Sequence, residues 1–134
     1  MTTFDSLNDA GPRPATVLYI EDNTSNVMLV ERLMLRRPAV RLLVAMLGAS
    51  GLELAVSEQP SLILVDMHLP DMTGETVLRR LRDGPSTSHL PVVVLSGDTT
   101  SHRQARVRRD GAVDYVTKPF DLRRFFEVID RYTQ

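Results

Sequence analysis

The chain has 134 residues, a length suited to a single domain with its own hydrophobic core. It contains no cysteine, which excludes disulfides, thiol nucleophiles and cysteine-bound metal centres. Hydrophobic residues make up 43% and charged residues 25% of the chain, which is typical of a folded globular protein, and the net charge of −1 argues against a surface that coats nucleic acid. The apolar runs are too short to cross a bilayer, so we expect no membrane span, and the N-terminus lacks the basic segment followed by an apolar core that a signal peptide requires.

The chain begins with a polar segment and continues as alternating apolar runs and segments of helical spacing. Residues 1–14 contain glycine and two prolines without a sustained period, and we expect a flexible tail there and one domain over residues 15–134. Runs rich in Val, Ile and Leu have the length of strands and are bounded by turn or cap residues. The predicted strands are 16–20, 40–46, 62–65, 91–95 and 113–116.

Apolar residues between these runs recur at helical spacing. Pro38 ends the first of these segments, and Asp121 is placed to cap the last. The segment 100–110 is the weakest, since Ala105 and Val107 are its only apolar residues between the flanking threonine and aspartate. The expected core-facing residues are Val27, Val30, Leu33 and Met34, then Leu52, Ala55 and Val56, then Val77, Leu78 and Leu81, and finally Leu122, Phe125, Phe126 and Ile129.

Five strands that alternate with five helices indicate an α/β fold. Strands that are apolar along their whole length are typical of a parallel sheet covered by helices on both faces, joined by right-handed crossovers. In such an open sheet, ligands bind beyond the carboxyl ends of the strands. The residues that follow each strand are therefore the candidates for a functional site.

Polar residues follow four of the five predicted strands. Glu21 and Asp22 follow the first, Asp66 the third, Ser96 the fourth, and Lys118 the fifth. Lys118 is the only lysine beside fifteen arginines. Three neighbouring carboxylates repel one another unless a cation neutralises them, and this set of oxygen ligands suits Mg²⁺. A lysine and a hydroxyl suit phosphoryl oxygens, and an aspartate can act as a nucleophile in phosphoryl transfer.

Each of these residues alone also fits a helix cap, a turn or a loop, and it is their combination at one sheet edge that favours a site.

The motifs around them are VLYIEDN at 17–23, LILVDMHLPDMTG at 62–74, VVVLSGD at 92–98 and DYVTKPF at 114–120. In order and spacing, they resemble the receiver domain of bacterial two-component response regulators over nearly the whole chain. The resemblance implies a flavodoxin-like, doubly wound, five-stranded parallel sheet of order 2-1-3-4-5 with five helices.

The resemblance also implies a phosphorylation site with a bound metal ion. Asp66 corresponds to the phosphoacceptor. A Mg²⁺ or Mn²⁺ ion would be held by Glu21, Asp22, Asp66 and the backbone carbonyl of His68. Asp22 corresponds to the acid that binds the ion directly, and Glu21 to its neighbour, which often acts through water. Glu21 stands where an aspartate is more common, a variant that the family tolerates.

Three further positions correspond to the family's switching residues. Ser96 matches the hydroxyl that bonds the phosphoryl group, and Lys118 matches the lysine that binds phosphate. The resemblance implies a cis bond between Lys118 and Pro119. Tyr115 corresponds to the aromatic residue that turns inward when Ser96 moves toward the phosphoryl group.

The segment 100–110 is unusually basic for this family. Two interpretations remain open: a solvated, loosely held helix, or a basic contact face for an acidic partner or a second copy of the chain. The residues of this possible partner face are Arg103, Arg106, Arg108 and Arg109.

The resemblance implies a cytoplasmic signalling protein and not an enzyme, beyond self-phosphorylation from small donors and autodephosphorylation. Its partners would be a histidine kinase or histidine phosphotransfer protein and a downstream protein target, with a phosphorylation-dependent homodimer also open, and with neither nucleic acid nor membrane as a direct partner. Phosphorylation would change the face formed by the segment 100–110, the strand at 113–116 and the last helix. Because the chain ends after that helix, we expect a stand-alone receiver, although the motifs also resemble receivers attached to hybrid histidine kinases.

Two alternatives belong to other functional classes. A Mg²⁺-dependent phosphohydrolase of the haloacid dehalogenase type also uses an aspartate nucleophile, but it needs a second aspartate where this chain has His68. A phosphorylation-independent binding module with the same fold would have no need of the carboxylates, Ser96 and Lys118.

Overall fold

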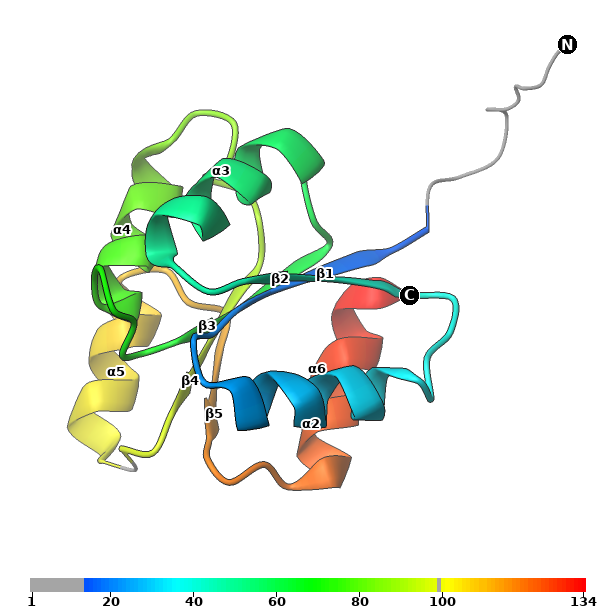
Figure 1. Ribbon diagram of the computed structural model, residues 1–134. Helices are drawn as coiled ribbons and strands as arrows, with labels where there is room; N and C mark the ends of the chain where they lie inside the picture. The colour runs from blue at the N-terminus through cyan, green and yellow to red at the C-terminus, as the bar shows by residue number, and fades with distance from the viewer. Residues whose placement is uncertain (1–13, 99) are drawn as a thin grey trace, which may run out of the picture.

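The computed structural model describes residues 14–98 and 100–134, in which five strands alternate with five helices (Figure 1). The tail expected at 1–14 lies outside the described residues, except for Pro14. Each observed strand begins and ends within one residue of its prediction. The elements are β1 (Thr16–Ile20), α2 (Thr24–Met34), β2 (Arg41–Ala45), α3 (Gly48–Glu58), β3 (Leu62–Asp66), α4 (Gly74–Asp83), β4 (Val92–Ser96), α5 (Ser101–Arg109), β5 (Asp114–Thr117) and α6 (Leu122–Thr133).

The strands form one parallel sheet of order β2-β1-β3-β4-β5, which confirms the expected topology. The chain moves outward from β1 to β2 and then returns to the other side of β1, so the strand order reverses at β1 and β3. In doubly wound sheets, the crevice at this reversal is the usual ligand site. The register places Ile20 beside Val65, and Asp66 beside Leu95, so that the carboxyl ends of β1, β3 and β4 lie together.

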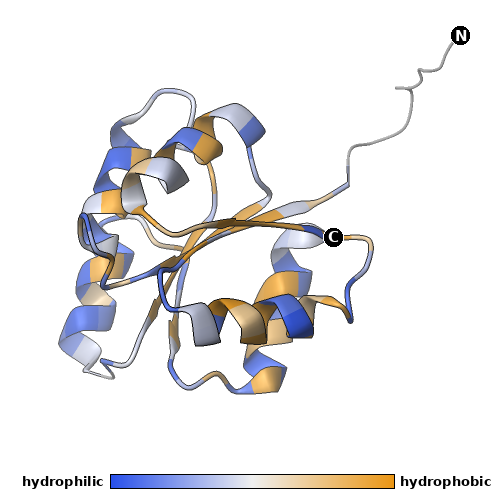
Figure 2. Cartoon of the chain, in the orientation of Figure 1, coloured by the Kyte–Doolittle hydropathy of each residue, from blue (hydrophilic) through white to orange (hydrophobic). Residues whose placement is uncertain are grey.

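Helices cover both faces of the sheet, and each face has its own apolar core (Figures 1 and 2). Helices α3, α4 and α5 contribute to the core on one face, and α2 and α6 to the core on the other. The side chains of β1, β3 and β4 are buried along their whole length, which explains the continuous apolar runs in the sequence.

Side chains at the helix starts account for where most helices begin. Asn23, Thr73, Thr100 and Asp121 each accept a hydrogen bond from a backbone N–H of the first turn that follows. The cap expected at Asp121 is thereby confirmed. Leu47, which precedes α3, provides no such side-chain cap.

Two residues predicted to face the core are instead exposed. The exposed fraction is 55% for Val56 and 45% for Leu122. Helix α3 packs on the sheet through small residues, because a Cβ at Gly51 would lie 2.4 Å from a methyl carbon of Ile20. This close approach brings Ala55 to the sheet and turns the neighbouring Val56 toward solvent.

Helix α5 has little apolar contact with the core, since Val107 is the one buried residue of 101–109.

Within the described part of the chain, no helix combines the length and the apolar character that a membrane crossing requires.

Candidate functional site

Three carboxylates meet at the carboxyl ends of β1 and β3. Glu21 and Asp22 directly follow β1, and Asp66 is the last residue of β3. One carboxylate oxygen of each lies within 4.8 Å of the others. Glu21 is 1% exposed and Asp66 7%, whereas Asp22 is exposed and its side chain forms no hydrogen bond or ion pair with the described residues. The cluster expected from the strand ends is therefore present.

Lys118 connects two of these carboxylates. It follows β5, and its Nζ donates to Oε1 of Glu21 at 2.7 Å and to Oδ1 of Asp66 at 2.6 Å. Burial alone would lower the pKa of Lys118, but the hydrogen bonds to Asp66 and Glu21 outweigh it and the pKa is raised above its ordinary value. The ammonium is therefore held in its charged form.

Glu21 is also held by groups that sequence reasoning missed. The Tyr19 hydroxyl donates to Oε1 of Glu21 at 2.9 Å, and Nδ2 of Asn26 donates to the same oxygen at 3.1 Å. The backbone N–H of Asn23 reaches Oε2 at 3.4 Å. Burial and the adjacent Glu21 raise the pKa of Tyr19 far above its ordinary value, so its hydroxyl remains a donor. The contact between Tyr19 and Glu21 could have been found from their spacing, because side chains two residues apart along an extended chain point to the same side.

The segment after β3 closes on the site from the side of α4. The backbone N–H of His68 donates to Oδ2 of Asp66 at 3.0 Å, and the His68 side chain is exposed. A Cβ at Gly74 would lie 2.5 Å from the carbonyl oxygen of Asp66, so the start of α4 can approach β3 only with a glycine there. The role expected for the His68 carbonyl stays a prediction.

Asp71 in the same segment supplies the cap that α3 lacks. Its two carboxylate oxygens accept the backbone N–H groups of Gly48 and Ala49 at 2.8 and 3.0 Å. These hydrogen bonds lower the pKa of Asp71 below its ordinary value, and the bond from Ala49 has the larger effect. The segment that follows Asp66 is thereby tied to a second helix.

Ser96 and Tyr115 meet at the backbone of Asp98. Oγ of Ser96, which is 2% exposed, accepts the N–H of Asp98 at 3.0 Å. The Tyr115 hydroxyl donates to the carbonyl oxygen of Asp98, and Tyr115 is 4% exposed. The peptide groups on both sides of Asp98 are thus held by the two residues to which the resemblance assigns the switch.

The donor set fits a divalent cation. The three carboxylates of the cluster and the single ammonium formally leave two negative charges uncompensated. Carboxylate oxygens are the hard ligands that Mg²⁺ and Mn²⁺ prefer, and such ions often share their coordination shell with phosphate oxygens.

Comparison with known proteins identifies the family. The family model described as the response regulator receiver domain matches residues 17–130. The chain belongs to this family. The expected resemblance is confirmed, and the chain is a signalling domain of the receiver type.

Two relatives of this receiver domain differ in how much of their length it spans. It is 31% identical over 119 residues to the polar-differentiation response regulator DivK of Brucella anthropi, a match that covers 89% of this chain and 96% of DivK. It is 35% identical over 130 residues to the response regulator PleD of Caulobacter vibrioides, covering 90% of this chain but only 28% of PleD. Receivers of this kind therefore occur both as nearly the whole of a protein and as one part of a larger one.

A solved structure shows the same fold. The receiver domain of the sensor histidine kinase PA1611 from Pseudomonas aeruginosa superimposes with a TM-score of 0.78 at 23% identity, covering 89% of this chain and 97% of that one. That structure has a magnesium ion coordinated in its active-site cleft.

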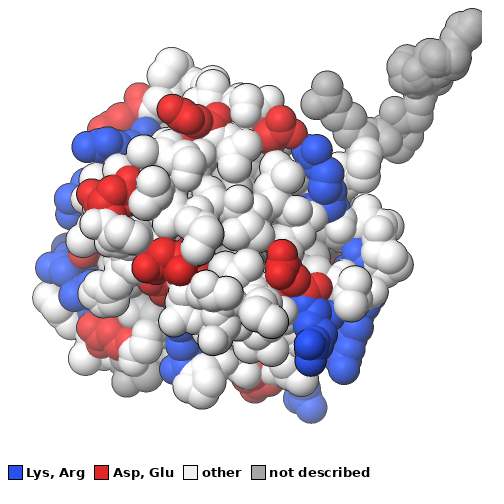
Figure 3. Space-filling view, in the orientation of Figure 1, with Lys and Arg blue, Asp and Glu red and all other residues white. Residues whose placement is uncertain are grey.

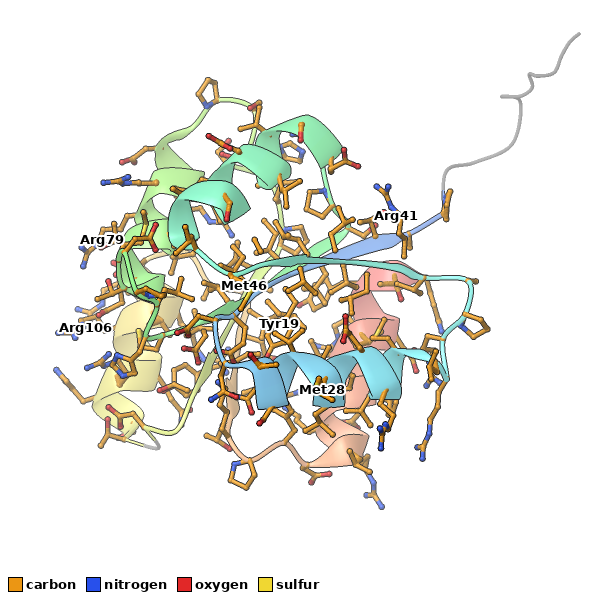
Figure 4. All side chains as sticks on the ribbon, viewed as in Figure 1. Tyr19, Met28, Arg41, Met46, Arg79 and Arg106 are labelled. Atoms are coloured by element: carbon orange, nitrogen blue, oxygen red, sulfur yellow. The ribbon has the colours of Figure 1, made fainter. Side chains whose placement is uncertain are left out.

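The basic side chains of α5 mostly pair with acids of the receiver domain itself. Nε of Arg106 contacts Oε2 of Glu75 at 3.0 Å, and Nη1 of Arg103 lies 3.6 Å from the other oxygen of Glu75. Nη2 of Arg108 contacts Asp114 at 2.9 Å. Figure 4 labels Arg106 on α5 and Arg79 on α4, both on the left of the view, and in Figure 3 basic and acidic groups alternate over these two helices. Helix α5 is thus held to α4 and β5 largely by ion pairs.

Proposed function

We propose that this receiver domain accepts a phosphoryl group on Asp66 and thereby switches a protein-interaction face formed by α5, β5 and α6. The donor would be a histidine kinase or a histidine phosphotransfer protein, and the reaction would take place in the cytoplasm with Mg²⁺ or Mn²⁺. The observation that carries the proposal is the bridge from Lys118 to Asp66 and Glu21 inside a cluster of three carboxylates. Membership of the receiver family supports it.

The transfer needs a carboxylate nucleophile, a leaving group and compensation of charge. An oxygen of Asp66 would form a bond to phosphorus while the bond between phosphorus and the donor's imidazole nitrogen breaks, and the electron pair of that bond returns to the ring, which leaves as neutral histidine after protonation. Glu21, Asp22, Asp66 and the carbonyl of His68 would hold the divalent cation. When bound, this cation supplies charge neutralisation for the phosphoryl oxygens.

Lys118 and Ser96 would bind the new phosphoryl group. The Lys118 ammonium already lies within 2.6 Å of Asp66, so a small movement brings it to a phosphoryl oxygen. Oγ of Ser96 accepts a hydrogen bond from Asp98, which leaves its own hydroxyl proton available to a phosphoryl oxygen.

The same contacts offer a route from the site to the proposed interaction face. A movement of Ser96 toward Asp66 would displace the N–H of Asp98 that it holds. The carbonyl of Asp98 accepts from Tyr115 on β5, so the displacement would reach the strand between α5 and α6. Arg103 also lies 3.8 Å from Asp98 and extends the route to α5. We propose that the partner or a second copy of the chain reads this face, including Arg103, Arg106, Arg108 and Arg109.

Phosphorylation by a small donor tests the proposal. Purified protein is incubated with radiolabelled acetyl phosphate and Mg²⁺, and label that is released by hydroxylamine is measured as acyl phosphate. We expect label on the wild-type protein and on Asp83→Asn, which changes an exposed aspartate of α4, and none on Asp66→Asn. Equal labelling of Asp66→Asn would refute the assignment of the phosphoacceptor.

A second measurement separates this function from the alternatives. We expect beryllofluoride with Mg²⁺ to change the affinity for a protein partner that binds the α5–β5–α6 face. An affinity indifferent to beryllofluoride would favour a phosphorylation-independent binding module, and multiple turnovers of a generic phosphate ester would favour a phosphohydrolase.

A further inference from the structure

One side of α2 carries an exposed row of residues that is complementary to its own reverse. Met28, Glu31, Arg32 and Leu35 stand at positions i, i+3, i+4 and i+7, so they lie on one side of the helix and its cap. All four are exposed, Met28 at 56% and Leu35 at 77% (Figure 4). We call these residues the α2 stripe. It has an apolar side chain at each end and an acid next to a base in the middle.

The charges in the middle of the α2 stripe have no partner within the described part of the chain. The side chains of Glu31 and Arg32 form no hydrogen bond or ion pair with the described residues. Arg37, shortly after the helix, differs, because it pairs with Asp130 on α6 at 2.7 Å. Glu31 and Arg32 are the charged residues of α2, and both therefore remain available to another molecule.

The α2 stripe lies on the side of α2 that faces the edge of the sheet. Glu31 and Leu35 line a groove of about 430 Å³ together with Val40, just before β2, and Leu42 within it. Arg36, by contrast, is directed to an aromatic ring of α6. The α2 stripe and β2 therefore border one continuous surface.

Strand β2 forms one edge of the sheet, and its outer side is open. It pairs with β1 alone among the described strands. Arg41 and Ala45 form backbone hydrogen bonds on the side of β1, so Leu42 and Val44, which alternate with them, direct their N–H and C=O groups outward. An edge with unpaired backbone groups is a template for pairing with another chain.

Two copies of the α2 stripe are complementary when their helices run antiparallel. A two-fold axis between Glu31 and Arg32 brings Met28 of one copy to Leu35 of the other. The same axis brings Glu31 of each copy to Arg32 of the other. The exposed apolar ends are thereby buried together, and each unpaired charge meets an opposite one. Parallel helices in register would instead place like charges together, so the pattern favours the antiparallel arrangement.

The edge of β2 fits the same axis. Because α2 and β2 border one groove, an antiparallel approach of two α2 helices also brings the two β2 edges together in antiparallel direction. With the axis at Leu43, Leu42 of each copy would exchange backbone hydrogen bonds with Val44 of the other. The two sheets would then join into one.

We propose that this chain forms a two-fold homodimer through the α2 stripe and the free edge of β2. This assembly is additional to the proposed phosphorylation, because β2 lies at the opposite edge of the sheet from β5 and the α2 stripe contains no member of the carboxylate cluster. The dimer therefore forms without a phosphoryl group and leaves the α5–β5–α6 face open to a partner.

Sedimentation equilibrium of the full chain in EDTA, from micromolar to millimolar concentration, measures the dissociation constant of the dimer. We expect the wild type and Asp66→Asn to dimerise equally. Glu31→Arg and Arg32→Glu should each weaken the dimer about tenfold, because like charges replace opposite charges at both symmetric pairs. The matched control is Asp83→Arg, at an exposed position of α4 on the other face of the sheet, and it should leave the dissociation constant unchanged.

Combinations of these variants separate direct pairing from a general effect of charge. A chain that carries both Glu31→Arg and Arg32→Glu should recover the dimer, because its swapped charges are again complementary. An equimolar mixture of the two single variants should form a heterodimer more tightly than either variant forms a homodimer. Leu35→Ser should lose the dimer without lowering the melting temperature of the monomer, because the Leu35 side chain is 77% exposed.

Three results would overturn the proposal. A wild type that remains monomeric at millimolar concentration would leave the α2 stripe to a different protein partner. A dimer that no variant of the stripe weakens would have its interface elsewhere. Single charge reversals that weaken the dimer without recovery in the double variant or in the mixture would show that Glu31 and Arg32 do not pair across it. None of these results bears on the labelling of Asp66, which tests the proposed phosphorylation separately.

Discussion

Replacement of Lys118 by methionine should destabilise the cation-free protein, and the loss should shrink when Mg²⁺ is added. Lys118→Met keeps the length of the side chain and removes its charge. In the native protein, the ammonium lies 2.7 Å from Glu21 and 2.6 Å from Asp66, and the side chains of these three residues are 20%, 1% and 10% exposed. Without the ammonium, two mostly buried carboxylates face each other with no cation between them.

The burial sets the size of the effect. Removal of one partner from a fully buried ion pair costs about 3–5 kcal/mol, because the other charge is left unpaired. Lys118 is partly exposed, so water can replace some of its contacts, and we expect a loss of about 2–3 kcal/mol in the free energy of unfolding. A divalent cation restores the missing charge and should bind the variant more tightly than the wild type, so the difference should fall below about 1 kcal/mol at saturating Mg²⁺.

Urea denaturation at pH 7, in EDTA and in MgCl₂, measures both values. Arg41→Met is the matched control, since Arg41 pairs with Glu58 in a partly exposed contact at the opposite end of the strands from the site, at side-chain exposures of 50% and 34%. That change should cost about 0.5 kcal/mol and should not depend on Mg²⁺. A loss in Lys118→Met no larger than in the control, or a loss that grows with Mg²⁺, would refute the electrostatic reasoning.

Four further predictions follow from the same contacts. Asp22→Asn should raise the cation-free melting temperature, because Asp22 is an unpaired member of the carboxylate cluster, and should abolish the stabilisation by Mg²⁺; a lower melting temperature in EDTA would contradict this. Asp71→Asn should lower the melting temperature at pH 7, because the lowered pKa of Asp71 in the folded protein means that its carboxylate stabilises the fold above the pKa of the unfolded chain. As the pH falls below 3.8 and the folded carboxylate is protonated, the difference in melting temperature between the wild type and the variant should narrow, and a constant difference down to pH 2.5 would exclude this role. Glu75→Gln should increase amide hydrogen exchange in α5, and the increase should fade in 0.5 M NaCl, whereas exchange equal to the wild type at low salt would show that the ion pairs do not hold the helix. Lys118→Arg should retain the charge yet impair the beryllofluoride-induced change in partner affinity, and a response equal to that of the wild type would show that the shape of the cation is unimportant.

The sequence predicts the sheet and the location of the site because both depend on local patterns. Continuous apolar runs identified all five strands, and the polar residues at four of the strand ends identified the edge at which Glu21, Asp66 and Lys118 meet. These residues come together in the fold because parallel strands place their carboxyl ends at one edge of the sheet.

Contacts between distant segments were beyond the reach of these patterns. Asp71 caps α3 from another loop, and the sequence around Gly48 does not indicate that the cap comes from a distant segment. The helix 101–109 has the composition of a solvated segment, and only the position of Glu75 on α4 and Asp114 on β5 shows that its arginines are largely used within the domain. Long side chains can reach many partners, so composition alone does not determine which of them they meet.

The difference between lysine and arginine in this chain follows from geometry. Arg37 donates to the two oxygens of Asp130 from Nε and Nη2 at 2.7 and 2.9 Å, a planar contact that suits a guanidinium. At the site, one nitrogen must instead lie within 2.7 Å of oxygens on two different residues, Glu21 and Asp66. A guanidinium distributes its charge and its donors over three nitrogens, so it would push these carboxylates apart, whereas an ammonium fits between them and can turn to a third acceptor. The single lysine therefore stands where a compact and movable charge is required.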